Sequence, residues 1–154
     1  LRRIMIFASE DIGVADPRAL TVAVDADRAF RRLGMPEGLY AMAQATLYLA
    51  CAPKSNAANV AWHRAREAVR EHGALPVPLT LRNAPTGLMK QLGHGRGYRY
   101  PHDESGGVAR GAEYLPAALR GAQFYEPTER GLEAKIHSWL AGVRSPKSDD
   151  GEED

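Results

Sequence analysis

The chain has 154 residues, of which 44% are hydrophobic and 25% charged, with a formal net charge of +1. That composition is typical of a globular domain, and the length suits a single domain whose core needs no disulfide or metal. No apolar run approaches the ~18 residues of a membrane span, no signal peptide is recognisable, and the lone Cys51 excludes an internal disulfide. We therefore expect a cytoplasmic protein without a membrane partner. Because Leu1 opens the chain in the middle of a helical pattern, we also expect a fragment of a longer protein.

Two helices separated by a short break are predicted at the start of the chain. Apolar side chains recur at helical spacing over residues 1–12, and Gly13 supplies the left-handed residue that ends many helices. Asp16 followed by Pro17 is typical of a helix N-terminus, because Asp caps the first amides and Pro fits the first turn. The second apolar stripe ends at Gly34, so a second helix is expected to end there.

A third and a fourth helix are predicted next. The third begins at Pro36 and stops before Pro53, and the fourth is capped by Ser55 or Asn56 and closes at Gly73. The third helix also carries small side chains that would let a neighbouring helix approach closely. These are Ala41, Ala43, Ala45 and Ala50.

The stretch that follows the fourth helix has a different character. Residues 75–81 (LPVPLTL) alternate proline with apolar residues, which predicts an extended segment outside any sheet. Asn83-Ala-Pro-Thr then introduces a short helix that ends at Gly93, and residues 93–107 (GHGRGYRYPHDESGG) form a long loop of the kind that is usually functional or packed. The last helix runs from about Glu129. The fold class is therefore all-α, a bundle of about five main helices with extended proline-rich and glycine-rich straps.

The small net charge hides an uneven distribution. Residues 147–154 (KSDDGEED) carry a charge of −4, which leaves +5 on residues 1–146. The acidic tail has no apolar side chain to anchor it, so we expect residues 146–154 to be disordered. The basic body allows weak attraction to nucleic acid, but a basic solvated surface is the more ordinary interpretation.

No catalytic motif is complete. The sequence has no GxxxxGK[ST] phosphate loop, no HExxH and no GxSxG. Gly93, Gly95 and Gly97 follow a helix rather than a strand, so they do not form a dinucleotide fingerprint. We therefore predict no catalytic, cofactor-binding or metal-binding residue in this chain.

Two clusters in the long loop nevertheless contain side chains that could bind a ligand or take part in a reaction. The first comprises His94, His102, Asp103 and Glu104. These residue types could bind a metal ion or act as acid and base, although solvated loop side chains are the plainer interpretation. The second interleaves cations with rings, as single-strand binders do, although tyrosines packed on the helices are the plainer interpretation. It comprises Arg96, Tyr98, Arg99 and Tyr100.

A third cluster lies on the fourth predicted helix. Its basic members are His63, Arg64, Arg66 and Arg70. Glu67 and Glu71 are interspersed among them, so a solvated, salt-bridged face is the plainer interpretation of this cluster. Cys51 lies between two alanines and is expected to be a small buried hydrophobe rather than a catalytic thiol.

Four strings of the sequence resemble one family in the same order. They are ASEDIGVADPRAL (8–20), YLACAPKSNA (48–57), LRNAPTGLMKQLGHGRGYRYPHDE (81–104) and FYEPTERGLEAKI (124–136). Together they resemble the C-terminal region of the replication-associated recombination protein A group of AAA+ ATPases, also called MgsA, whose eukaryotic relatives are the Werner-helicase-interacting proteins. Motif residues that the resemblance marks, and that we expect to be structural, are Asp16, Pro17, Pro53, Lys54, Asn56, Asn83, Pro85, Tyr98, Tyr100, His102, Pro127, Arg130 and Gly131.

The resemblance implies a division of labour within a longer protein. Residues 1–12 would be the helix at the junction with a missing AAA+ lid, residues 13–145 a helical oligomerisation domain like the clamp-loader collar, and 146–154 the acidic tail. ATP and magnesium would be bound upstream, so no cofactor is expected in this fragment. The family implies a homotetramer, contact with DNA through the full-length protein, association with single-stranded-DNA-binding protein, and a place in the bacterial cytoplasm at the nucleoid.

Three functional hypotheses follow. The first is a non-catalytic homotetramerisation domain of a DNA-dependent AAA+ ATPase that acts in replication-fork maintenance and recombination. The alternative is a helical module that binds single-stranded DNA. Its candidate contacts are Arg64, Arg66, Arg70, Arg96 and Arg99. The third, a small metal-dependent enzyme using His94, His102 and Asp103, has the least support.

Overall fold

All regular structure is helical in the computed structural model, which describes residues 1–144, and this confirms the predicted all-α class. The chain divides into two compact units. The first consists of Leu1–Arg66 with Gln123–Trp139, and the second of Glu67–Ala122 with residues 140–144. Within residues 1–144, no helix has the length and apolar character needed to cross a membrane.

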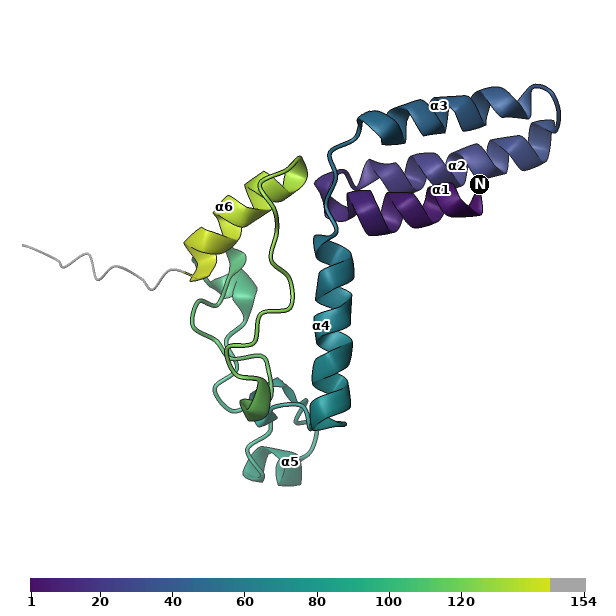
Figure 1. Ribbon diagram of the computed structural model, residues 1–154. Coiled ribbons are helices and arrows are strands. Elements are labelled where there is room, and N and C mark those ends of the chain that lie inside the picture. Colours follow the sequence, from purple (N-terminus) through teal and green to yellow (C-terminus); the bar gives the residue numbers. More distant parts are fainter. Residues whose placement is uncertain (145–154) are drawn as a thin grey trace, which may run out of the picture. The chain divides into compact units, whose positions relative to one another are not determined.

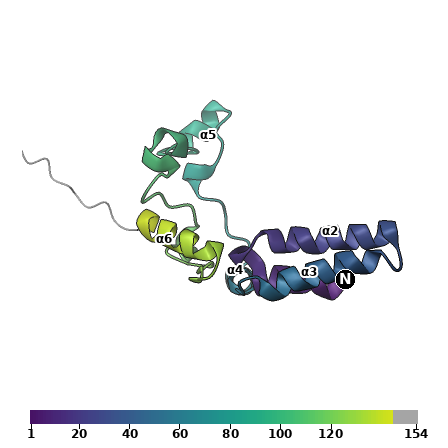
Figure 2. The ribbon, with the colours of Figure 1, turned by 90° about the horizontal axis from the view of Figure 1, so that it is seen from above.

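The first unit is built around a hairpin of two long helices. α1 (Arg2–Phe7) continues as a π-helical stretch, Ala8–Ile12, and is followed by α2 (Arg18–Leu33) and α3 (Gly38–Cys51). α2 and α3 lie side by side, and α1 packs against α2 (Figure 1, Figure 2). The core of this unit is made largely of small side chains, which lets the backbones approach closely. Its members are Ala8, Ile12, Ala19, Ala23 and Leu49.

The predicted helix ends at glycines are confirmed at Gly13 and Gly34, which have φ of 53° and 70°. The predicted start of the third helix is two residues early, because Pro36 lies in the turn that joins α2 to α3. Gly38 begins α3 instead, at a point where a Cβ would meet the ring of Phe30 at 2.9 Å. The close pairing of α2 with α3 therefore depends on a small residue that the sequence pattern did not single out.

The two remaining long helices each begin in the first unit and end in the second. α4 (Ala57–His72) follows Asn56 and closes at Gly73, where φ is 68°, as predicted. α6 (Leu132–Arg144) starts three residues later than the predicted Glu129, because Gly131 has φ of 54° and cannot continue a right-handed helix.

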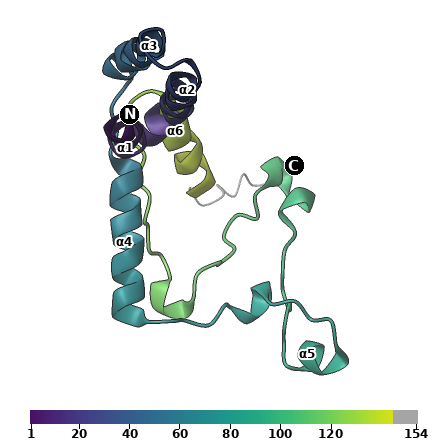
Figure 3. The ribbon, with the colours of Figure 1, turned by 90° about the vertical axis from the view of Figure 1, so that its right-hand side faces the viewer.

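The second unit contains little regular structure, and Figure 3 shows its long connecting segments. α5 (Gly87–Gln91) is capped by Thr86, whose hydroxyl accepts a hydrogen bond from the Met89 amide. The expected extended segment after α4 runs to a 3-10 turn, Leu79–Leu81, and pairs with the glycine loop through the Gly95 amide and the Leu79 carbonyl (2.8 Å). Other single 3-10 turns are Pro101–Asp103, Ser105–Gly107 and Ala117–Leu119.

The predicted division into 1–12, 13–145 and 146–154 follows different boundaries from the two compact units, and it stays a prediction. The acidic tail, with its expected disorder, lies outside the described residues.

Candidate functional site

Three of the four motif strings lie in the first unit, where Lys54 contacts several of their residues. Its ammonium group donates hydrogen bonds to the carbonyl oxygens of Leu49 (2.8 Å), Ala50 (3.2 Å) and Ala52. These carbonyls belong to the last turn of α3 or follow it directly, where a cation also interacts favourably with the helix dipole. The same ammonium lies 5.5 Å from the ring centroid of Phe7. Lys54 therefore caps α3 and connects it to α1.

Replacing Lys54 by methionine is expected to lower the free energy of unfolding by about 1–2 kcal/mol. Methionine keeps much of the aliphatic volume but donates nothing to the helix end. Lys135→Met, at an exposed position of α6, is the matched control. The measurement is the urea midpoint of the parent and both variants at one protein concentration. Equal midpoints for all three proteins would show that the ammonium group contributes nothing here.

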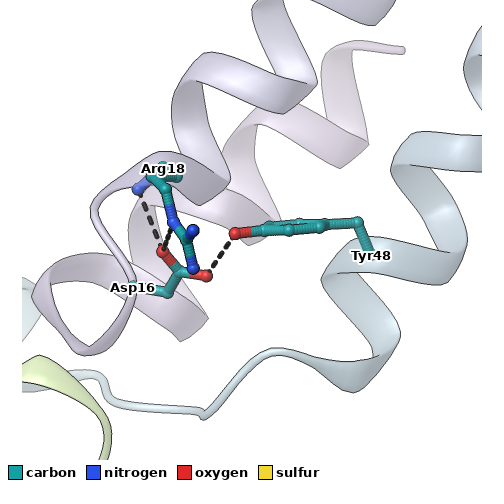
Figure 4. A network of polar contacts seen from close by, with 3 residues as sticks. All are labelled: Asp16, Arg18 and Tyr48. Carbon is teal, nitrogen blue, oxygen red and sulfur yellow. Dashed lines mark hydrogen bonds and ion pairs between the residues drawn. The ribbon is translucent and has the colours of Figure 1, made fainter.

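Asp16 joins the beginning of α2 to α3 (Figure 4). One carboxylate oxygen accepts hydrogen bonds from the Arg18 amide (3.1 Å) and from its Nε (3.2 Å), and the other accepts from the Tyr48 hydroxyl (2.5 Å). Burial alone would raise the pKa of Asp16, but the hydrogen bonds from Tyr48 and Arg18 outweigh it and hold the pKa below its ordinary value. The predicted capping role is confirmed, and the bond to Tyr48 adds a link between helices.

Glu133, in the first turn of α6, is fully buried and accepts four hydrogen bonds. Oε2 accepts from the Ser55 hydroxyl (2.6 Å) and from the amide (2.9 Å) and hydroxyl (2.7 Å) of Thr128, while Oε1 accepts from the Tyr125 hydroxyl (2.9 Å). Burial opposes ionisation, yet these donors hold the pKa of Glu133 below its ordinary value. The pKa of Tyr125 is raised, mainly because burial disfavours the ionised phenol and secondly because the hydroxyl donates its hydrogen bond to the Glu133 carboxylate.

The segment before α6 is fixed against the α3–α4 connection. Arg130 donates from Nη1 to the Lys54 carbonyl (3.1 Å), and the Ser55 amide donates to the Asp11 carbonyl (2.8 Å). A Cβ at Gly131 would overlap the Ala15 carbonyl oxygen and lie 2.7 Å from Cγ of Pro53. The backbone can come this close only because position 131 has no side chain.

The other motif residues of this unit lie around the same contacts. Pro127 is half-buried, whereas Pro17 and Asn56 are exposed. Asn56 accepts the Val60 amide through its own carbonyl, within the first turn of α4. We define the polar node as Asp11, Asp16, Tyr48, Lys54, Ser55, Tyr125, Thr128, Arg130 and Glu133. It joins α1, α2, α3, α4 and α6.

The fourth motif string lies in the second unit. The Asn83 carbonyl faces Nδ1 of His94 at 3.3 Å, and Pro85 is exposed. Tyr98 and Tyr100 are each about half exposed, and the Tyr100 ring lies 5.0 Å from that of His102. Tyr98 also lines a largely apolar pocket of about 630 Å³ between the straps of this unit. The two tyrosines are therefore less buried than side chains packed on helices would be.

The five candidate DNA-contacting arginines differ in their surroundings. Arg99 forms a two-point ion pair with Glu104 (2.7 and 2.6 Å) and donates to the Arg110 carbonyl. Arg64 pairs with Glu126 at 2.8 Å, and Arg70 lies 3.9 Å from Glu67. The guanidinium of Arg66 lies over the exposed ring of Trp62, at 5.8 Å, and Arg96 is exposed. Arg64 and Arg66 belong to the first unit, whereas Arg70, Arg96 and Arg99 belong to the second.

The acid/base cluster of the loop does not converge on a metal site. Within residues 1–144, no three histidine, cysteine, aspartate or glutamate side chains lie close enough together to hold a metal ion. His94 contacts the Asn83 carbonyl, His102 contacts the Tyr100 ring, and Glu104 pairs with Arg99. The expectation for Cys51 was wrong, because its side chain is exposed at the end of α3.

Sequence reasoning missed Glu133, Tyr125 and Thr128. It named Ser55 as a possible cap of α4, and the Ser55 hydroxyl does accept the Ala57 amide (3.2 Å), but the bond from Ser55 to Glu133 was not foreseen. A signal for Glu133 was present. It lies three residues before Ile136, on the stripe that continues through Leu140 and Val143 and faces the interior, whereas Leu132 and Trp139 are exposed. An ionisable residue on an apolar stripe is a candidate for a buried, fully bonded group.

The structure thus defines an all-helical domain whose motif residues in the first unit hold its helices together. The chain belongs to the family described as MgsA AAA+ ATPase C terminal, whose model matches residues 1–144. It is 58% identical over 143 residues to replication-associated recombination protein A of Coxiella burnetii, a match that covers 93% of this chain and 32% of that protein.

Two further relatives show the same relation. The chain is 51% identical to replication-associated recombination protein A of Escherichia coli K12, with 91% of this chain and 32% of that protein covered. It is 42% identical to ATPase WRNIP1 of Dictyostelium discoideum, with 82% of this chain and 14% of that protein covered. The chain thus spans about a third of the length of the bacterial relatives. These matches confirm the family that the four strings indicated.

Proposed function

We propose that this chain is a non-catalytic homotetramerisation domain of a DNA-dependent AAA+ ATPase that acts in replication-fork maintenance and recombination. The family description supports the placement after an ATPase module, and the names of the relatives support the process. ATP and Mg²⁺ would bind in that module, where a neighbouring subunit's arginine could complete each site. DNA and single-stranded-DNA-binding protein would be partners of the full-length protein in the bacterial cytoplasm.

The observation that carries this proposal is the amount of large apolar surface that the chain exposes in both units. In the first unit the exposed side chains include Leu33, Met35, Leu39, Tyr40, Leu47 and Trp62. In the second unit they include Val69, Val77, Leu79, Leu88, Leu92 and Tyr114. A domain that stayed monomeric would leave all of these in water, whereas a symmetric assembly covers such surface.

The isolated chain is expected to have four times its mass of 16.8 kDa without nucleotide, DNA or an ATPase module. Light scattering on the gel-filtered protein, at several concentrations and in high salt, measures this mass directly. An apolar interface resists salt, because it contains little charge for ions to screen. A monomer at every concentration would refute the proposal. No observation in residues 1–144 favours the DNA-binding alternative, which stays a prediction.

A further inference from the structure

α3 differs from the helix with which it forms a hairpin, because it contains no charged residue at all. The outer side of α2 carries exposed Asp25, Arg28 and Arg32, as expected of a helix that faces water. α3 has the sequence GLYAMAQATLYLAC, in which Gln44 and Thr46 are the non-aromatic polar residues, and a helix this apolar is ordinarily buried over most of its surface. The described residues of the first unit cover only one side of α3.

The covered side of α3 presents Gly38, Ala45 and Leu49 to the rest of the first unit. The opposite side of α3 is exposed, and its central stripe, here called the outer face, is made of Tyr40, Ala43, Leu47 and Ala50. Gln44 and Cys51 are also exposed and lie along one edge of this stripe. Tyr40 is 76% and Leu47 68% exposed. Thr46 lies along the other edge, and its hydroxyl donates a hydrogen bond to the Met42 carbonyl of the same helix (2.8 Å).

The outer face has the pattern of a helix-pairing seam. Its residues are spaced by three, four and three positions, as in the contact stripe of paired helices, and large side chains alternate with small ones. Two copies of α3 could pair antiparallel about a two-fold axis that passes through the pair at the level of residue 45. In that register, residue i of one copy lies opposite residue 90 − i of the other. Tyr40 would then face Ala50 of the second copy, and Ala43 would face Leu47. Every large side chain would meet a small one.

We propose that the outer face of α3 binds the same face of a second copy of this chain, antiparallel, in an isologous contact. This assignment rests on the proposed function, because it names the surface that a homotetramer would use. A parallel arrangement would set Tyr40 and Leu47 against their own counterparts and leave gaps between alanines. A nucleic acid would find no cation on this face. The uncharged and self-complementary pattern therefore fits a second α3.

Leu47→Asp tests the contact on the full chain. Because Leu47 is exposed, the charge does not enter the core, and circular dichroism should show unchanged helix content. The expected result is a mass of half the tetramer or less, since a dihedral tetramer that loses one kind of contact falls into dimers. Thr21→Asp is the control, because Thr21 is exposed on the same charged outer side of α2 as Asp25 and Arg28, and this variant is expected to keep the parent mass.

A size swap tests the antiparallel register more sharply. Leu47→Ala alone sets alanine against alanine, and Ala43→Leu alone sets leucine against leucine, so each should raise the dissociation constant at least about 30-fold. The double variant A43L/L47A again sets large against small, and its dissociation constant is expected to return to within about tenfold of the parent. Analytical ultracentrifugation over a dilution series measures all four proteins.

The possible outcomes separate this inference from the proposed function. A parent chain that is monomeric refutes the homotetramer itself. A parent tetramer that survives Leu47→Asp, or a swap that does not restore what Leu47→Ala loses, overturns the α3 contact and leaves the tetramer in place. Dissociation by Leu47→Asp together with rescue by the swap supports both the surface and its register.

Discussion

Replacing Glu133 by alanine is expected to lower the free energy of unfolding by about 3 kcal/mol or more, which corresponds to a melting temperature roughly 10 °C lower. The carboxylate is fully buried and is the shared acceptor for Ser55, Tyr125 and Thr128. Its removal leaves those donors without their acceptor in the interior, and it also leaves a cavity. Glu113→Ala, at an exposed position, is the control and should change stability by less than about 0.5 kcal/mol.

The pH dependence of stability follows from the same group. The pKa of Glu133 is lower in the folded chain than in the unfolded chain, so protonation favours unfolding. Its contribution is complete above the ordinary carboxyl pKa of about 4.3, and it is lost as the pH falls through the lower folded-state value. Asp16 acts in the same direction. Urea midpoints between pH 7 and pH 3 should therefore fall less steeply for Glu133→Gln than for the parent, and parallel curves would contradict the role assigned to Glu133.

The positions of the helices were predictable because the residues that start and end a helix lie next to it in the sequence. A glycine with positive φ ends a helix wherever it occurs, and Asp16 caps α2 through an amide only two residues away. The late start of α6 was not predictable in this way, because the residues around Gly131 do not show that it adopts a positive φ. Its close neighbours, Ala15 and Pro53, are far away in the sequence. Errors of two or three residues at Pro36 and Glu129 are therefore errors of boundary, not of element.

The polar node was not predictable in this way, because its bonds join residues far apart in the chain. Ser55 and Glu133 are separated by 78 positions, and Tyr48 and Asp16 by 32. The resemblance marked Lys54, Arg130 and Gly131 without saying what they contact. Their contacts arise because the α3–α4 connection and the segment before α6, which are far apart in the sequence, lie against each other in the fold. Exposure could not be predicted locally either. Cys51 is flanked by two alanines, as a small buried residue often is, but among residues 1–144 the face of α3 on which it lies is not covered by the first unit.

Gly131→Ala is expected to cost about 3 kcal/mol or more in the free energy of unfolding, for two reasons that act together. The backbone has φ of 54°, a conformation that costs an alanine about 1 kcal/mol or more. The added Cβ would also overlap the Ala15 carbonyl oxygen and lie 2.7 Å from the Pro53 ring, and neither neighbour is the end of a flexible side chain. Relief therefore requires the segment before α6 to move away from the first unit, which weakens the bonds that Arg130 and Glu133 make there.

Gly142→Ala provides the matched comparison, because Gly142 lies within α6, has ordinary helical φ and has open space where a Cβ would be added. There the same substitution should raise stability by about 0.5–1 kcal/mol, since alanine loses less backbone entropy on entering a helix. Urea unfolding of both variants and the parent, at one protein concentration because assembly adds to apparent stability, measures the contrast. Two glycines eleven positions apart should thus respond with opposite sign. A Gly131→Ala protein as stable as the parent would show that the segment 127–131 does not pack against Ala15 and Pro53 as tightly as the structure places it.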